Sequence, residues 1–125
     1  MTFPYDFGFV PRTKAEDGDP VDVLVLMDEP AFTGCLIKCR LIGVIEGEQE
    51  KNGTKLRNDR LVAIEQSNHV YITVDDISQL PKQLLREIGE FFVQYHALRD
   101  QKFRVLAHKG PDEARMIIDQ GLKAA

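Results

Sequence analysis

The chain has 125 residues, of which 43% are hydrophobic and 29% charged, and this composition is typical of one soluble globular domain. Its longest apolar stretch, Val23 to Met27, is far too short to span a membrane, and no basic leader with an apolar stretch opens the chain. The formal net charge of −4 argues against a nucleic-acid partner and against polybasic attachment to a membrane.

The chain opens with an aromatic segment, residues 3–11, which two prolines and a glycine interrupt. We expect extended chain with bends there, followed by a polar loop to Pro20. The almost wholly apolar run Val21 to Met27 is rich in valine and predicts a strand buried on both faces. The segment Asp28-Glu29-Pro30 is expected to break this strand, and Phe32-Thr33-Gly34 to turn the chain into the next one.

A long strand is predicted from Cys35 to about Glu46, and its two cysteines are predicted to be reduced. Four residues of strand separate their Cα atoms by about 13 Å, which is beyond the reach of a disulfide. Free thiols favour a cytoplasmic location, so we expect Cys35 and Cys39 to be packing residues. The polar stretch Glu46 to Asp59 contains Asn52-Gly53 and predicts a hairpin or a long loop.

The pattern changes from strands to helices in the second half. Leu61 to Glu65 and Val70 to Val74 are predicted as short strands. An amphipathic helix follows, with a start near Ser78 or Gln79 and Pro81. It is marked by apolar residues at three- and four-residue spacing: Leu84, Leu85, Ile88, Phe91, Phe92, Tyr95 and Leu98.

The chain ends with a strand and a helix. Phe103 to Ala107 predicts the strand, and Gly110-Pro111 opens a last helix that passes through Ile118 and fades at Gly121. Strands first and helices last favour an α+β domain with an antiparallel sheet or barrel.

The densest candidate site is Glu16-Asp17-Gly18-Asp19-Pro20-Val21-Asp22, with three aspartates in six residues. Crowded carboxylates repel one another, and proteins commonly neutralise them with a metal or with protons. Hard oxygen ligands without nearby His or Cys indicate Mg²⁺, Mn²⁺ or Ca²⁺. The glycine position and the missing twelfth-position glutamate exclude an EF-hand. A solvated turn explains the same residues about as well.

The run Asp17 to Val25 resembles the signature of the soluble family I inorganic pyrophosphatases. The aromatic segment 3–11 and three later blocks resemble that family in the same order: 43–45, 60–64 and 91–95. The resemblance implies one domain over residues 1–125, a small OB-type antiparallel β-barrel with two C-terminal flanking helices. It also implies Mg²⁺-dependent hydrolysis of pyrophosphate to two phosphates, with Mn²⁺ as a substitute.

The resemblance assigns roles to particular residues. Asp17 and Asp22 are expected to be metal ligands, and Asp19 is expected to accept the proton of the attacking water. Arg60 stands where the family usually has a phosphate-binding lysine, and Tyr95 matches a phosphate-binding tyrosine. Periodicity alone explains Tyr95 equally well as a core aromatic. Lys102 and His96 complete the substrate-binding candidates; His96 replaces a lysine, which would make phosphate affinity pH-dependent.

Several positions depart from the family pattern. Asn58 stands where a metal-binding aspartate is expected, and an amide oxygen can ligate without supplying charge. A second expected acid aligns with Gln49, whose neighbours Glu48 and Glu50 are candidates to replace it or form a solvated edge. Phe7 stands where a tyrosine hydroxyl would touch phosphate.

The family carries an N-terminal segment before the aromatic stretch, and this segment supplies a strand and three active-site residues. Here Met1 directly precedes that stretch, so we expect an incomplete barrel whose seam another copy covers in a homo-oligomer. The sequence leaves open two alternatives to pyrophosphate hydrolysis. One is a weak or inactive protein that binds phosphate and metal, and the other is a hydrolase of another phosphoanhydride.

Overall fold

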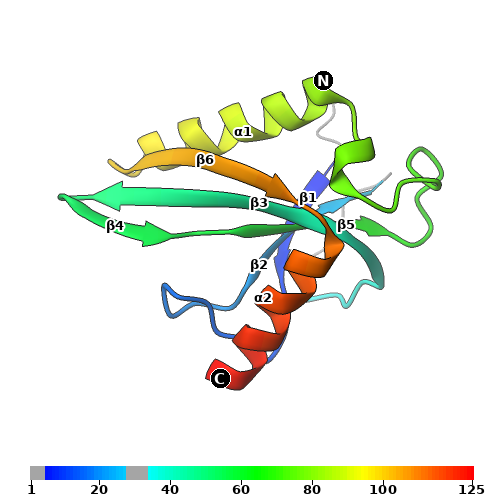
Figure 1. Ribbon diagram of the computed structural model, residues 1–125, viewed down its shortest axis with the longest axis horizontal. Coiled ribbons are helices and arrows are strands. Elements are labelled where there is room, and N and C mark those ends of the chain that lie inside the picture. Colours follow the sequence, from blue (N-terminus) through cyan, green and yellow to red (C-terminus); the bar gives the residue numbers. More distant parts are fainter. Residues whose placement is uncertain (1–4, 28–33) are drawn as a thin grey trace.

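The computed structural model describes residues 5–27 and 34–125, which form a six-stranded sheet with one helix on each face (Figure 1). The elements in chain order are β1 (Tyr5–Phe9), β2 (Asp22–Leu26), β3 (Cys39–Lys51), β4 (Thr54–Arg57), β5 (Arg60–Glu65), the 3₁₀ turn η1 (Ile77–Gln79), α1 (Lys82–Ala97), β6 (Lys102–Lys109) and α2 (Pro111–Ala124). The predicted α+β class is confirmed.

The break expected at 28–33 lies outside the described residues. None of the helices is long and apolar enough to cross a membrane, within the part of the chain described.

The strands follow the order β1-β2-β5-β3-β4, and β6 pairs with β3. β3 is long enough to pair with β5 along its first half and with β4 along its second half, while β6 lies along its other edge. Four pairings are antiparallel, as expected, but β2 and β5 run parallel. A parallel pair needs a long connection, which the β3–β4 hairpin provides here. Over the described residues the sheet is open and not a closed barrel.

The core consists of two layers, because the central strands are buried on both faces. On β5, Leu61 packs toward α2 with Ala114, whereas Val62 and Ile64 pack toward α1 with Phe92. This alternation is the two-residue period of a strand. It explains why the predicted strands read as continuous apolar runs.

The predicted strand Val70–Val74 is wrong, because these residues form turns. The Asn68 side-chain oxygen accepts a hydrogen bond from the Tyr71 amide at 2.9 Å, which stabilises the turn. The Arg40 guanidinium then binds the carbonyl oxygens of Tyr71 and Val74 at 3.0 and 2.9 Å. Side-chain hydrogen bonds to the backbone therefore replace the ladder of a strand in this segment.

Other boundaries differ by a few residues. The long strand begins at Cys39, so Cys35 precedes it; both cysteines are free, as predicted. β3 continues to Lys51, and the hairpin alternative is confirmed at Asn52-Gly53, where both residues have positive φ, 53° and 81°. α2 does not fade at Gly121 but continues to Ala124.

Candidate active site

The loop between β1 and β2 presents the three aspartates, and hydrogen bonds within the loop fix its shape. The Asp19 amide donates to the Asp17 carboxylate at 3.0 Å, and the Ala15 amide donates to the Asp19 carbonyl at 2.7 Å. Gly18 has a φ of 92°, a conformation that glycine adopts most readily. The turn interpretation of this segment is therefore correct for the backbone, and the carboxylates remain available for a site.

Asp22 and Arg60 lie side by side because β2 and β5 run parallel. Leu24 is paired with Val62, and both pack in the α1 layer. Two residues earlier on each strand, and therefore on the same face, stand Asp22 and Arg60. The parallel register thus brings together a carboxylate and a guanidinium that are 38 positions apart in sequence.

Two cavities meet at Asp22. The acidic cavity, of about 300 Å³, is lined by Asp17, Asp22 and Asn58 together with the C-terminal turn of α2. The aromatic cavity, of about 210 Å³, is lined by Asp22, Arg60, Tyr95 and three phenylalanine rings. Carboxylates, together with Lys14 and Arg57, thus line one side of Asp22, and a guanidinium with a phenol lines the other.

The electrostatic state of Asp22 reflects this position. Burial is the main cause that raises the pKa of Asp22 above its ordinary 3.8, while Arg60 acts in the opposite direction. The neighbouring carboxylates of Asp17 and Asp19 raise the pKa further. A buried carboxylate whose pKa is raised in this way is suited to a bound cation, which would favour its ionised form.

Arg60 is almost wholly buried, with 8% of its surface exposed. Its guanidinium carbon lies 4.4 Å from the ring centre of Phe92 and 5.4 Å from that of Phe103. Nη2 lies 3.3 Å from Nε2 of His96, whereas Nη1 is buried without a hydrogen-bond partner in the described structure. Burial lowers the pKa of Arg60, and the Asp22 carboxylate opposes this shift. A buried unpaired donor is costly unless an anion accepts its hydrogen bond.

His96 lies beneath the aromatic cavity and does not line it. It is 3% exposed, stacks on Phe103 with ring centres 4.7 Å apart, and places Nδ1 2.8 Å from Oε1 of Gln101. Burial lowers the pKa of His96 below 6.5, Gln101 opposes the shift, and Arg60 and Arg99 add to it. The imidazole is therefore neutral near pH 7.

Two side-chain amides occupy positions at which the resemblance implies acids. The Asn58 amide nitrogen donates to Oε1 of Gln49 at 2.6 Å, and Asn58 is only 8% exposed. The nearby acids are engaged elsewhere: Asp59 binds Arg57, and Glu48 binds Arg104. On this side of the acidic cavity, Asn58, paired with Gln49, therefore lies beside the ion pair of Arg57 and Asp59.

The comparisons with known proteins agree with this geometry. The family model described as inorganic pyrophosphatase matches residues 1–125. The chain belongs to the inorganic pyrophosphatase family. It is 36% identical to the inorganic pyrophosphatase of Nostoc sp. over 99% of this chain and 71% of that protein. It is 40% identical to that of Nanoarchaeum equitans over 96% of this chain and 74% of that protein.

Solved structures place the fold in the same family. The pyrophosphatase from Helicobacter pylori superposes with a TM-score of 0.83 at 34% identity, covering 99% of this chain and 72% of that one. The enzyme from Thermus thermophilus gives a TM-score of 0.85 at 29% identity, with 98% and 70% covered. The expected OB-type fold is thus confirmed. Family membership makes this chain an enzyme, an inorganic diphosphatase dependent on a divalent metal, whose reaction is hydrolysis of pyrophosphate.

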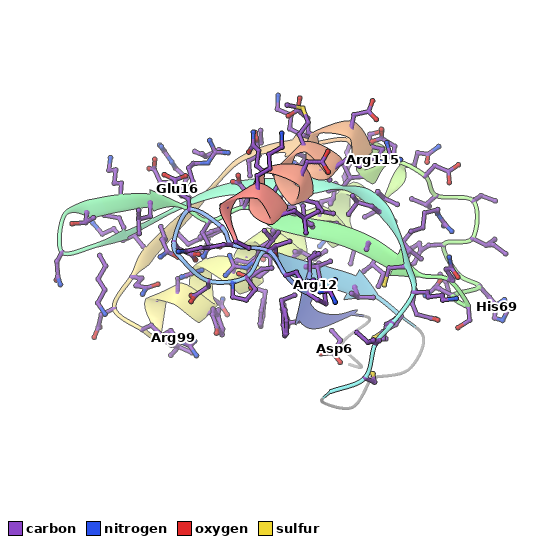
Figure 2. The ribbon with its side chains drawn as sticks, turned by 90° about the horizontal axis from the view of Figure 1, so that it is seen from below. Asp6, Arg12, Glu16, His69, Arg99 and Arg115 are labelled. Atoms are coloured by element: carbon purple, nitrogen blue, oxygen red, sulfur yellow. The ribbon has the colours of Figure 1, made fainter. Side chains whose placement is uncertain are left out.

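The structure of this pyrophosphatase brings most of the predicted site residues together. Asp17, Asp22 and Asn58 line the acidic cavity, and Arg60 and Tyr95 line the aromatic one. Asp19 lies in the same loop and is exposed. In Figure 2 this loop, marked by Glu16, and the end of α1, marked by Arg99, lie toward the same end of the molecule, with His69 at the opposite end.

Two predicted residues lie apart from the cavities of the pyrophosphatase. Lys102 is exposed at the start of β6, opposite Glu50 of β3, and lines neither cavity. His96 is covered by Phe103, as described above. The sequence analysis did not single out Gln101 or Phe103 as site residues. The turn after α1 brings Gln101 to His96, and Phe103 meets His96 and Arg60 only when β6 folds back against α1, so no sequence pattern marks either residue.

Proposed function

We propose that the acidic loop and Arg60 carry out the pyrophosphate hydrolysis that family membership assigns to this chain. The observation that carries this proposal is the position of Asp22 between the two cavities. Pyrophosphate is a polyanion, and its hydrolysis requires charge neutralisation on one side and donors to the phosphate oxygens on the other. Asp17 and Asp22 supply the cation-binding side, and Arg60 and Tyr95 supply the donors.

The oxygen donors around the acidic cavity fit a divalent cation. Asp17, Asp22 and the amide oxygen of Asn58 are hard ligands, and burial together with the neighbouring carboxylates raises the pKa of Asp22, so a nearby cation would stabilise its ionised form. Among the described residues, no three acidic, histidine or cysteine side chains already stand in a metal-binding arrangement. Asp17 and Asp22, with the Asn58 amide oxygen, would hold the cation. We propose Mg²⁺, with Mn²⁺ as a substitute.

Each residue then has a distinct task. When bound, the cation would supply a more acidic water and neutralise phosphate charge. Asp19, exposed beside Asp17, accepts the proton of the attacking water. The Nη1 group of Arg60 and the Tyr95 hydroxyl donate hydrogen bonds to phosphate oxygens, which satisfies the buried donor. Lys102 lines neither cavity, so its proposed contribution to substrate binding is limited to positive charge at a distance.

The proposed role of Asp19 is tested by phosphate release from pyrophosphate with Mg²⁺. Asp19→Asn keeps the shape of the side chain but removes the base, so turnover is expected to fall about 100-fold or more. Asp119→Asn on the exposed face of α2 is the matched control and is expected to retain wild-type turnover. Equal activity of Asp19→Asn and wild type would exclude Asp19 as the base. A nucleotide or polyphosphate hydrolysed faster than pyrophosphate would assign another phosphoanhydride as substrate.

Asn58→Asp tests whether the neutral amide pair limits the reaction. The new carboxylate adds a charged ligand at the acidic cavity, so we expect higher turnover at low Mg²⁺ and a lower Mg²⁺ requirement. Steady-state kinetics over a Mg²⁺ series measure both quantities. Unchanged kinetics would show that charge at this position does not limit catalysis.

We further propose that the enzyme is a cytoplasmic homo-oligomer. β1 lies at one end of the strand order of the described residues, and its Phe9 is 61% exposed. Apolar rings on an edge strand favour burial against another copy. The two free cysteines support a reducing compartment.

A further inference from the structure

We propose that His96 is a positioning residue: a neutral imidazole, fixed in one tautomer by Gln101, holds the Arg60 guanidinium so that Nη1 remains available to a phosphate oxygen. This inference rests on the phosphate-binding role proposed above for Arg60. It gives His96 a role without direct contact with substrate, in agreement with its position beneath the aromatic cavity.

The tautomer follows from the partners of the two ring nitrogens. Nε2 of His96 lies 3.3 Å from Nη2 of Arg60, and a guanidinium has donors but no acceptor. Nε2 must therefore carry the lone pair, and in a neutral ring the proton then resides on Nδ1. Nδ1 lies 2.8 Å from Oε1 of Gln101, which accepts a hydrogen bond from the Nδ1–H group. One proton arrangement therefore fits Nη2 of Arg60, both ring nitrogens of His96 and Oε1 of Gln101.

The turn after α1 holds this arrangement in place. The amides of Arg99 and Gln101 both donate to the His96 carbonyl, at 2.9 and 3.0 Å, so Gln101 is brought back over the residue that it orients. Asp100 has a φ of 57°, which lets the chain reverse within this turn. The His96 ring also lies nearly parallel to Phe103, at 7°, which restricts its rotation.

The close approach of Phe103 depends on Gly47 of β3. A Cβ atom at Gly47 would lie 2.3 Å from the Phe103 ring. The absence of a side chain at Gly47 therefore leaves room for the Phe103 ring, which contacts both the imidazole of His96 and the guanidinium of Arg60. Four separate elements, β3, β5, α1 and β6, thus converge on the orientation of Arg60.

A protonated His96 would break this arrangement. The charged groups that face the imidazole are Arg60 of β5 and Arg99 beyond α1, and both are cations. On the β6 side, Gln101 and Phe103 carry no charge. An imidazolium would also direct an Nε2 proton at the donors of Arg60. Protonation is therefore expected to displace the guanidinium and to weaken phosphate binding.

Two variants separate hydrogen bonding from packing. His96→Gln retains an acceptor for Arg60 and a donor for Gln101 but has no proton to gain near neutral pH. His96→Phe retains a stacked ring and removes both nitrogens. His108→Gln, at an exposed histidine of β6, is the matched control. Isothermal titration calorimetry with inorganic phosphate in Mg²⁺ buffer, from pH 5 to pH 8, measures the affinity of each protein.

At pH 7.5, we expect His96→Phe to bind phosphate about tenfold more weakly than wild type, the effect of one lost hydrogen bond to a charged group. His96→Gln is expected to bind within about twofold of wild type. As the pH falls below 6.5, wild type and His108→Gln should lose affinity relative to His96→Gln. Since phosphate protonation affects all proteins equally, this ratio isolates the imidazole. Equal loss in His96→Gln and His96→Phe at pH 7.5 would overturn the inference.

Nitrogen NMR of the imidazole provides a readout that needs no activity. With three histidines in the chain, the signals are assigned by substitution, and His96 is expected to carry its proton on Nδ1 at pH 7.5. A proton on Nε2 would overturn the inference. A wild type without phosphate binding would overturn the role of Arg60 together with this inference. Wild-type binding that survives His96→Phe would overturn this inference alone.

Discussion

Arg60 shows how neighbouring residues decide what one side chain can do. Its guanidinium lies between the rings of Phe92 and Phe103, where a planar cation stacks well and a lysine ammonium would not. These rings therefore favour an arginine at a position where the sequence comparison led us to expect a lysine. The Asp22 carboxylate stabilises the charge of the Arg60 guanidinium, and Nε2 of His96 lies beside Nη2. Nη1 of Arg60 has no hydrogen-bond partner in the described structure, and a phosphate oxygen would accept its hydrogen bond.

At the same scale, Asp22→Asn is expected to stabilise the metal-free protein. The pKa of Asp22 is raised in the folded state, so the folded protein binds more protons than the unfolded one just above pH 3.8. The contribution of Asp22 to stability is therefore present below pH 3.8 and is lost as pH rises through the raised pKa. At pH 7 with EDTA, removal of the charge should raise Tm by about 3 °C.

Thermal melts with EDTA and with Mg²⁺ measure this effect. Wild type should gain stability from Mg²⁺ because the cation binds only the folded state, and Asp22→Asn should gain less. Asp119→Asn controls for the loss of one surface charge. A lower Tm for Asp22→Asn in EDTA would show that its attraction to Arg60 outweighs burial and repulsion.

At the scale of elements, α2 and the acidic loop support each other. The Lys14 amide donates to the Gly121 carbonyl at 3.0 Å. A Cβ atom at Gly121 would lie 3.0 Å from side-chain atoms of both Thr13 and Val21, so the helix approaches the loop closely. The blue loop and the red end of α2 lie together in Figure 1. The last helix therefore helps to place the aspartates, although it carries none of the proposed ligands.

Thr13→Val tests this support within the loop. The Thr13 hydroxyl donates to the Val10 carbonyl at 2.6 Å and accepts from the Val21 amide at 3.0 Å. Valine keeps the shape and leaves both backbone groups unpaired, which should cost about 1–3 kcal/mol of unfolding free energy. The Mg²⁺ concentration for half-maximal activity should also rise. Urea unfolding and a Mg²⁺ titration measure these two effects.

Thr54→Val at an exposed position of β4 is the control for this change and should be nearly neutral. A stability loss without a change in Mg²⁺ requirement would limit Thr13 to a structural role. Unchanged stability would contradict the importance of its two hydrogen bonds.

Elements whose signal is local were predicted correctly. The 3.6-residue period marked α1, Gly110-Pro111 marked the start of α2, and Asn52-Gly53 marked the hairpin. The segment Val70–Val74 was mispredicted because Asn68 and Arg40 bind its backbone, and apolar residues alone do not reveal this. The length of β3 likewise depends on its three partner strands.

At the scale of the whole molecule, the open edge of the sheet at β1 and its exposed Phe9 ring support the proposal that the protein forms an oligomer. Phe9 on β1 is 61% exposed, and β1 has a hydrogen-bonded neighbour on one side only within the described sheet. An apolar edge of this kind favours pairing with another copy. The proposed homo-oligomer would cover it.

Phe9→Glu is expected to shift the protein from an oligomer to a monomer. The new charge opposes burial of the β1 edge, and sedimentation velocity at micromolar concentration measures the change in mass. Val70→Glu, at an exposed turn residue with 73% of its surface accessible, is the control and should leave the oligomer intact. A monomeric wild type, or an oligomer that persists in Phe9→Glu, would contradict the proposed role of this edge.

The sequence by itself determined the family, the α+β class and the acidic loop, because these depend on residues adjacent in the chain. Composition predicted one domain, and the aspartate motif predicted the cation-binding side of the proposed site. Only the tertiary structure decided which phosphate-binding candidates reach a cavity. The parallel register of β2 and β5 placed Arg60 beside Asp22, and the turn after α1 placed His96 behind it. Strand register and ring packing join residues far apart in sequence, so local patterns could not specify them.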